Sequence, residues 1–170
     1  FHPRANRVAS ASQAQFWFVR AAFFWLVASG LLLSWYAADA LANGKTLDQF
    51  EVDAVRHMLT IGVVTMMIIG MAMLVVPEFA GRRLQHPQER GVTWAMFIAI
   101  NLAAMLRVWP ALEGIDWLSS DRYWPMAAAG VLATAAVAAF AFMLAQSYLE
   151  QRQKDWASLE ALGRRPTPRT

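Results

Sequence analysis

The sequence predicts an all-α polytopic membrane protein with four transmembrane helices and both termini in the cytoplasm. Of its 170 residues, 58% are hydrophobic and 16% are charged, whereas soluble domains contain roughly 45–50% apolar residues. The apolar residues gather into four long blocks, which is typical of membrane-spanning helices. Basic residues are shared unevenly between the segments that flank these blocks, and this bias orients the spans.

A tail at residues 1–14 precedes the first span, which we expect at about residues 16–37. A helix of this length covers about 33 Å at about 1.5 Å per residue, enough to cross a hydrocarbon core of roughly 30 Å. The block lacks the short apolar stretch and small-residue cleavage site of a signal peptide. It therefore opens a four-helix transmembrane domain that we place at residues 15–148.

The second and third spans both end next to a proline. We expect them at about residues 55–76, before Pro77, and at about residues 92–109, before Pro110. Proline disfavours the helical conformation in the residue before it, so each proline is expected to end its helix.

The fourth span, at about residues 125–148, begins with Pro125 and is rich in alanine. Proline is tolerated in a first turn, where its missing N–H is not needed, and alanine lets neighbouring membrane helices approach closely. We expect residues 149–170 to form a cytoplasmic helical extension followed by a disordered tail.

Charge and aromatic residues both define the orientation of these spans. The two tails and the middle loop carry most of the basic residues, namely Arg4, Arg7, Arg82, Arg83, Arg90, Arg152, Lys154, Arg164, Arg165 and Arg169. The opposite loops hold only two basic residues, Lys45 and Arg122. Tryptophan and tyrosine gather near both expected membrane boundaries. This pattern predicts cytoplasmic termini in a bacterial cytoplasmic (inner) membrane, with the lipid bilayer as a partner. No dense basic run indicates nucleic acid, although the isoelectric point is near 9.8.

The chain contains no cysteine, which excludes disulfides, thiolate metal sites and cysteine nucleophiles. No hydrolase, nucleotide-binding or metalloprotease motif occurs, so the sequence provides no self-sufficient catalytic constellation. Met66 and Met73 share a helix face but are too widely spaced to chelate one ion, and we interpret them as core residues. Copper is therefore not expected from this chain alone.

His57 is the most informative polar residue at membrane depth. Asp53 precedes it by four residues and Thr60 follows it by three, so a helix that begins early enough places both beside the ring. A carboxylate or hydroxyl there would fix the tautomer and leave one ring nitrogen for a metal. The alternative is a local Asp53–His57 pair at the water boundary. In a regular helix, the face opposite His57 contains two glycines that leave room for a neighbouring helix. This face consists of Gly62, Met66, Gly70 and Met73.

Two polar residues of the third span have structural and functional interpretations. Arg107 is expected at the depth of His57, where it either extends to the headgroups or pairs with Asp53 or with an anionic haem propionate. Asn101, in mid-span, predicts a hydrogen bond to a neighbouring helix.

The stretch from Asp53 to Leu84 resembles the NnrS family of haem- and copper-containing bacterial membrane proteins. The similar residues are Arg56, His57, Thr60, Gly62, Gly70, Met71, Pro77, Phe79, Gly81 and, in the third span, Leu106 to Val108. The resemblance implies a membrane haem protein associated with nitric oxide or denitrification responses, with His57 as the metal ligand.

Two functions of different classes therefore remain open. The first is a haem b-binding membrane protein with His57 as axial ligand, Arg107 as propionate partner and Asp53 or Thr60 beside the ring. The second is a non-catalytic accessory or scaffolding subunit of a larger respiratory or photosynthetic complex, in which His57 binds a haem or a chlorin. Either implies other membrane subunits or a homo-oligomer as partners. A transporter or channel ranks third, because the spans carry few ion-coordinating groups.

Overall fold

A computed structural model describes residues 13–44, 46–80, 89–111 and 123–163, and these residues contain helices but no strand. The elements are α1 (Gln13–Asn43), α2 (Gln49–His57), the π-helix η2 (Met58–Thr65), α3 (Met66–Ala80), α4 (Glu89–Val108), the 3₁₀ turn η3 (Trp109–Ala111) and α5 (Tyr123–Gly163). Four segments are long and apolar enough to cross a membrane: Gln15–Asn43, Gln49–Val76, Gly91–Ala111 and Trp124–Leu149. The predicted all-α, four-span fold class is confirmed. Of the tails expected at the two ends, residues 1–12 and 164–170 lie outside the described residues, whereas α5 continues to Gly163 through most of the expected helical extension.

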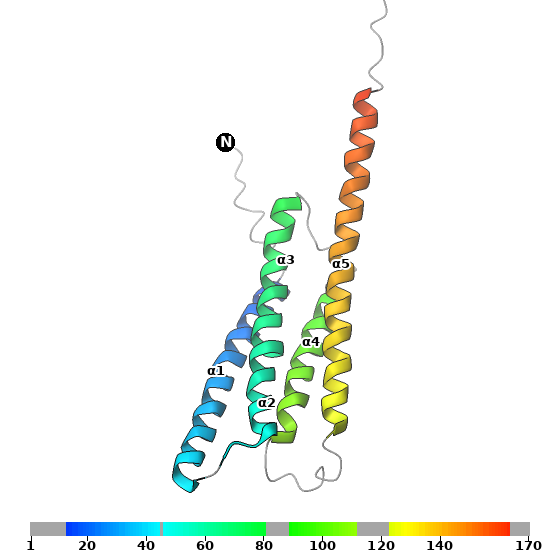
Figure 1. The fold of residues 1–170 in the computed structure, drawn as a ribbon. Helices are drawn as coiled ribbons and strands as arrows, with labels where there is room; N and C mark the ends of the chain where they lie inside the picture. Colours follow the sequence, from blue (N-terminus) through cyan, green and yellow to red (C-terminus); the bar gives the residue numbers. More distant parts are fainter. Residues whose placement is uncertain (1–12, 45, 81–88, 112–122, 164–170) are drawn as a thin grey trace, which may run out of the picture.

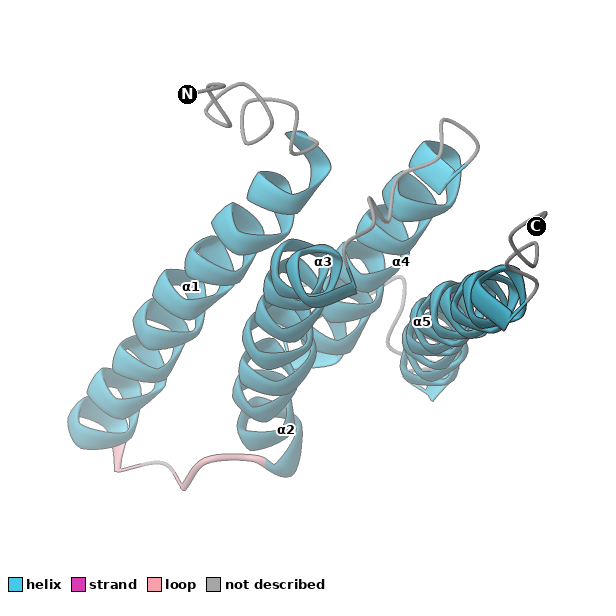
Figure 2. Cartoon of the chain, turned by 90° about the horizontal axis from the view of Figure 1, so that it is seen from above, coloured by secondary structure: helices cyan, strands magenta, loops and turns pink. Residues whose placement is uncertain are grey.

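The second span, formed by α2, η2 and α3, lies between its neighbours (Figure 1). It packs against α1 on one side and against α4 on the other, while α5 packs mainly against α4. Seen from above, the helices are spread out rather than closed into a ring (Figure 2). The start of α1 and the end of α5 lie at the same end of the bundle, beyond which α5 projects (Figure 1).

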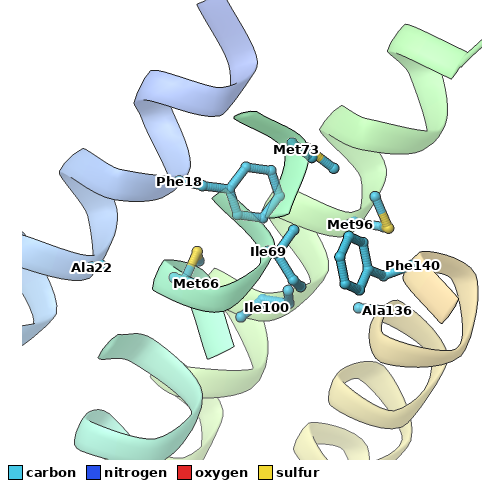
Figure 3. Close-up of a cluster of buried hydrophobic side chains, with 9 residues drawn as sticks. All are labelled: Phe18, Ala22, Met66, Ile69, Met73, Met96, Ile100, Ala136 and Phe140. Atoms are coloured by element: carbon cyan, nitrogen blue, oxygen red, sulfur yellow. The ribbon is translucent and has the colours of Figure 1, made fainter. Parts of the chain in front are cut away.

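A buried core joins all four spans near the end of the bundle where α1 begins. Side chains from the four spans point toward one another in Figure 3. Its members are Phe18, Ala22, Met66, Ile69, Met73, Met96, Ile100, Ala136 and Phe140. Met66 and Met73 are therefore core residues, as predicted.

Two glycines on the second span leave room for side chains of α1. A Cβ at Gly62 would lie 2.6 Å from Trp25 Cγ, and one at Gly70 would lie 3.0 Å from Phe18 Cβ. Because glycine has no side chain, large α1 rings pack directly on the backbone there. The predicted contact face is confirmed, and Val64 and Ile68 on the opposite side of the span are exposed.

The expected helix end at Pro77 is wrong, because α3 continues to Ala80. Pro77 has no N–H, so the carbonyl of Met73 lacks its usual helical donor. The side chain of Gln15 on α1 replaces that donor, with Nε2 donating to Met73 O over 2.8 Å in a buried hydrogen bond. A contact between helices thus satisfies the carbonyl and lets α3 pass through the proline.

Other helix boundaries also differ from those expected. The first span extends to Asn43, and the second begins at Gln49. The α-helical part of the third span ends at Val108, one residue before the 3₁₀ turn that contains Pro110. This turn is held to α1 by Tyr36, whose hydroxyl donates to Ala111 O over 3.3 Å.

Candidate functional site

The start of α2 determines where the candidate site residues lie. Asp48 caps the helix, since its carboxylate accepts from Gln49 N, while Glu51 accepts from Asp48 N over 2.8 Å in a capping box. The helix therefore begins early enough to place Asp53 one turn before His57 on the same face. The Asp-x-x-Glu spacing in the sequence could have predicted this start.

The ring of His57 is held through its Nδ1 atom. Nδ1 lies 2.8 Å from the backbone oxygen of Asp53 and 3.1 Å from Asp53 Oδ1. A carbonyl and a carboxylate oxygen only accept hydrogen bonds, so Nδ1 must carry the donated proton. In the neutral ring the lone pair then sits on Nε2, and among the described residues Nε2 has no hydrogen-bond partner.

Arg107, near the end of α4, joins the same group. Its Nε lies 4.0 Å from Asp53 Oδ2, and the side chains of Arg107 and Asp53 are 22% and 28% exposed. Ion pairs as exposed as this contribute little stability, about 1 kcal/mol or less. Arg107 therefore places a positive charge beside the carboxylate that contacts His57.

Among the described residues, Thr60 has no hydrogen bond to the ring of His57. Its exposed hydroxyl donates to Arg56 O over 2.9 Å, and Thr65 donates to Thr60 O five residues earlier over 2.9 Å. These bonds lie in or beside the π-helix, whose wider turn rotates Thr60 away from the position that a regular α-helix would give it. Local spacing brings Asp53 and His57 together, and the packing of α4 adds Arg107. The hydroxyl of Thr60 bonds to its own helix instead.

A hydrogen bond between α1 and α4 lies beside the π-helix. Trp25 Nε1 donates to Asn101 Oδ1 over 3.0 Å, and Asn101 Nδ2 donates to Phe97 O over 2.8 Å. The predicted hydrogen bond between Asn101 and another helix is confirmed, with Asn101 as the acceptor, and Trp25 is the donor that sequence reasoning missed. The indole also packs on Gly62, so α1, the π-helix and α4 are fixed against one another just beneath His57.

The described residues contain no group of three or more histidine or carboxylate side chains able to hold a metal ion. The described residues that meet at His57 supply one imidazole nitrogen, a carboxylate beside the ring and a guanidinium. Such a set suits a cofactor that brings most of its own ligands, as a haem does with four porphyrin nitrogens. It suits a bare metal ion less well, since that needs several protein donors.

A family model described as NnrS protein matches residues 4–152. The match covers most of the chain and includes all four spans, well beyond the stretch that carries the resemblance in the sequence. No curated protein and no solved structure matches the chain.

Proposed function

Because the chain belongs to the NnrS family, we propose that it is a haem-binding integral membrane protein in which His57 is an axial ligand of haem b. The observation that carries the proposal is the geometry of His57. Its Nδ1 is occupied by two acceptors of Asp53 at 2.8 and 3.1 Å, which leaves the Nε2 lone pair available to iron. Metal-binding histidines in proteins are commonly oriented in this way.

The neighbouring residues fit the same cofactor. The Asp53 carboxylate would hold the imidazole and make it a stronger donor. Arg107, 4.0 Å from that carboxylate, would pair with a haem propionate near the membrane boundary. A haem held here would supply an iron that binds diatomic gases, which agrees with the association with nitric oxide or denitrification that the family resemblance implies.

The proposed location is the bacterial cytoplasmic membrane, with both termini in the cytoplasm. The start of α1 and the end of α5 lie at one end of the bundle, and in the sequence most basic residues stand before α1, between α3 and α4, and after the fourth span. The positive-inside rule then assigns this end to the cytoplasm. His57 would lie near the opposite, periplasmic surface.

The absorption spectrum of protein purified from haem-supplied cells tests the proposal. We expect a Soret band that is lost in His57→Ala and kept in Thr60→Ala, a matched control one turn away whose hydroxyl bonds only to its own helix. Absence of a Soret band in the wild-type protein, or equal bands in all three proteins, would overturn the assignment.

A second candidate is an accessory subunit of a larger membrane complex that binds a haem or chlorin through His57. It is favoured by the single nitrogen ligand at the site, because a six-coordinate iron would take its other axial ligand from elsewhere. Native mass spectrometry of mildly solubilised membranes separates the two. A chain that keeps haem with no other protein bound supports the first candidate, and a stable complex with unrelated chains supports the second.

A further inference from the structure

Arg20 lies on the face of α1 that points away from the bundle. The buried residues Phe18, Ala22 and Trp25 lie on the opposite side of the helix, where α1 meets the second span. Within residues 16–31, six exposed apolar side chains fall within about 60° of Arg20 at about 100° per residue. They are Phe16, Trp17, Phe23, Phe24, Val27 and Leu31. Arg20 therefore places a charge in the middle of a large apolar surface that faces the bilayer.

The guanidinium of Arg20 has no ion-pair partner among the described residues. It contacts Trp17, whose ring centroid lies 5.5 Å from Arg20 Cζ. Residues 1–38 contain no aspartate or glutamate. Asp39 stands at the far end of α1, about 28 Å from Arg20 at about 1.5 Å per residue. The counter-charge of Arg20 therefore does not come from its own helix or from the segment before it.

The neighbouring helix α3 does not place a carboxylate beside Arg20 either. α1 and α3 run in opposite directions (Figure 1), with Gln15 beside Met73. Glu78, the acidic residue of α3, follows Met73 toward one end of the bundle, and Arg20 follows Gln15 toward the other. The levels of Arg20 and Glu78 thus differ by about 15 Å along the axis. The side chain of Arg20 also leaves α1 on the side away from α3.

The contact with Trp17 places the charge of Arg20 near the membrane boundary. Trp17 precedes Arg20 by about one helical turn, and it lies at the end of the bundle where α1 begins. The side chain of Arg20 runs back toward this end, since its guanidinium lies over the Trp17 ring. Tryptophan rings in membrane proteins sit at the level of the lipid headgroups. The anionic group available at that level is a lipid phosphate.

We propose that Arg20 and Trp17 bind the headgroup of an anionic phospholipid of the phosphatidylglycerol class. The planar guanidinium donates two parallel hydrogen bonds to the phosphate, and the Trp17 ring holds the guanidinium by a cation–π contact. The acyl chains would lie along Phe24, Val27 and Leu31, which continue the same exposed face toward the bilayer centre. A zwitterionic lipid fits less well, because its own ammonium group offsets the charge of its phosphate.

Native mass spectrometry of the full chain in mild detergent tests the proposal by measuring the dissociation constant of the first bound lipid. The wild type should bind phosphatidylglycerol more tightly than phosphatidylcholine with the same acyl chains. Arg20→Gln should weaken phosphatidylglycerol binding about fivefold, the effect of one basic residue near an anionic membrane surface. Because Arg20 is exposed, this variant should keep the melting temperature of the wild type.

Arg152→Gln is the matched control. It removes the same charge from an exposed position of α5, beyond the end of the fourth span at Leu149, and should weaken phosphatidylglycerol binding less than about twofold. Equal losses in Arg20→Gln and Arg152→Gln would indicate general attraction to basic residues and would overturn the proposal. Equal binding of the two lipids by the wild type would overturn it as well.

Two further measurements test the geometry of the site and the nature of its ligand. Trp17→Leu keeps the apolar surface but removes the ring that holds the guanidinium, so it should weaken phosphatidylglycerol binding about twofold or more; unchanged binding would contradict a role for the ring. A large excess of inorganic phosphate should not displace the bound lipid, because the acyl chains contribute to its binding. Displacement would assign the site to a free anion and overturn the proposal.

Discussion

The hydrogen bond from Gln15 to Met73 allows a sharp prediction about how α3 passes through Pro77. Replacing Gln15 by leucine leaves the buried carbonyl of Met73 without a donor, which costs about 1–3 kcal/mol. The loss is partly offset, because Gln15 Oε1 is itself buried without a partner among the described residues and disappears in the variant. We therefore expect Gln15→Leu to lower the free energy of unfolding by about 1–2 kcal/mol.

Pro77→Ala restores an N–H four residues after Met73, so the carbonyl no longer depends on Gln15. In that background, Gln15→Leu should cost about 0.5 kcal/mol or less, which gives a coupling energy of about 1–2 kcal/mol in a double-mutant cycle. The free energy of unfolding of the wild type, the two single variants and the double variant is measured by reversible unfolding in mixed micelles. Ser34→Ala, which removes an exposed hydroxyl bonded to its own helix, is the control and should change stability little. Equal costs of Gln15→Leu with and without Pro77 would refute this explanation of the continuous helix.

Three further predictions concern the π-helix and the histidine. Trp25→Phe keeps a ring on Gly62 but removes the donor to Asn101 Oδ1 at 3.0 Å, and it should lower stability by about 0.6–1.7 kcal/mol in thermal unfolding. Gly62→Ala places a Cβ 2.6 Å from Trp25 Cγ and should cost about 1–3 kcal/mol, whereas Gly130→Ala should cost nothing in the monomer; equal effects would contradict the packing described here. Asp53→Asn weakens the hold on His57 Nδ1 and should lower haem affinity about 10–100-fold in a titration, and unchanged affinity would show that the carboxylate does not support the ligand.

Much of the fold could be predicted from the sequence because the bilayer imposes simple demands. Each span must be a long apolar helix, so blocks of hydrophobic residues locate all four. The notched face of the second span was also predictable, since Gly62, Met66, Gly70 and Met73 recur at helical spacing. Proline was misleading at Pro77, because the donor that replaces its missing N–H comes from Gln15, 58 positions before Met73 in the sequence.

The candidate site was predictable where it depends on local spacing. Asp53 and His57 are four residues apart in a capped helix, and their contact follows from that geometry. Thr60 was expected to lie beside the ring, but the π-helix from Met58 to Thr65 changes the angular position of every residue in it. Nothing in the spacing of those residues indicates a wider turn, which coincides with the packing of Trp25 on Gly62. The choice of Trp25 as the partner of Asn101 likewise depends on how α1 and α4 pack.

The role of His57 as a haem ligand is tested most directly by imidazole rescue. The absorption spectrum of haem-loaded His57→Gly protein is recorded before and after free imidazole is added. If the ring of His57 binds the iron, the Soret band of the wild-type protein is lost in the variant and returns when imidazole occupies the vacated position. A variant that keeps the wild-type band without imidazole would contradict haem ligation by His57.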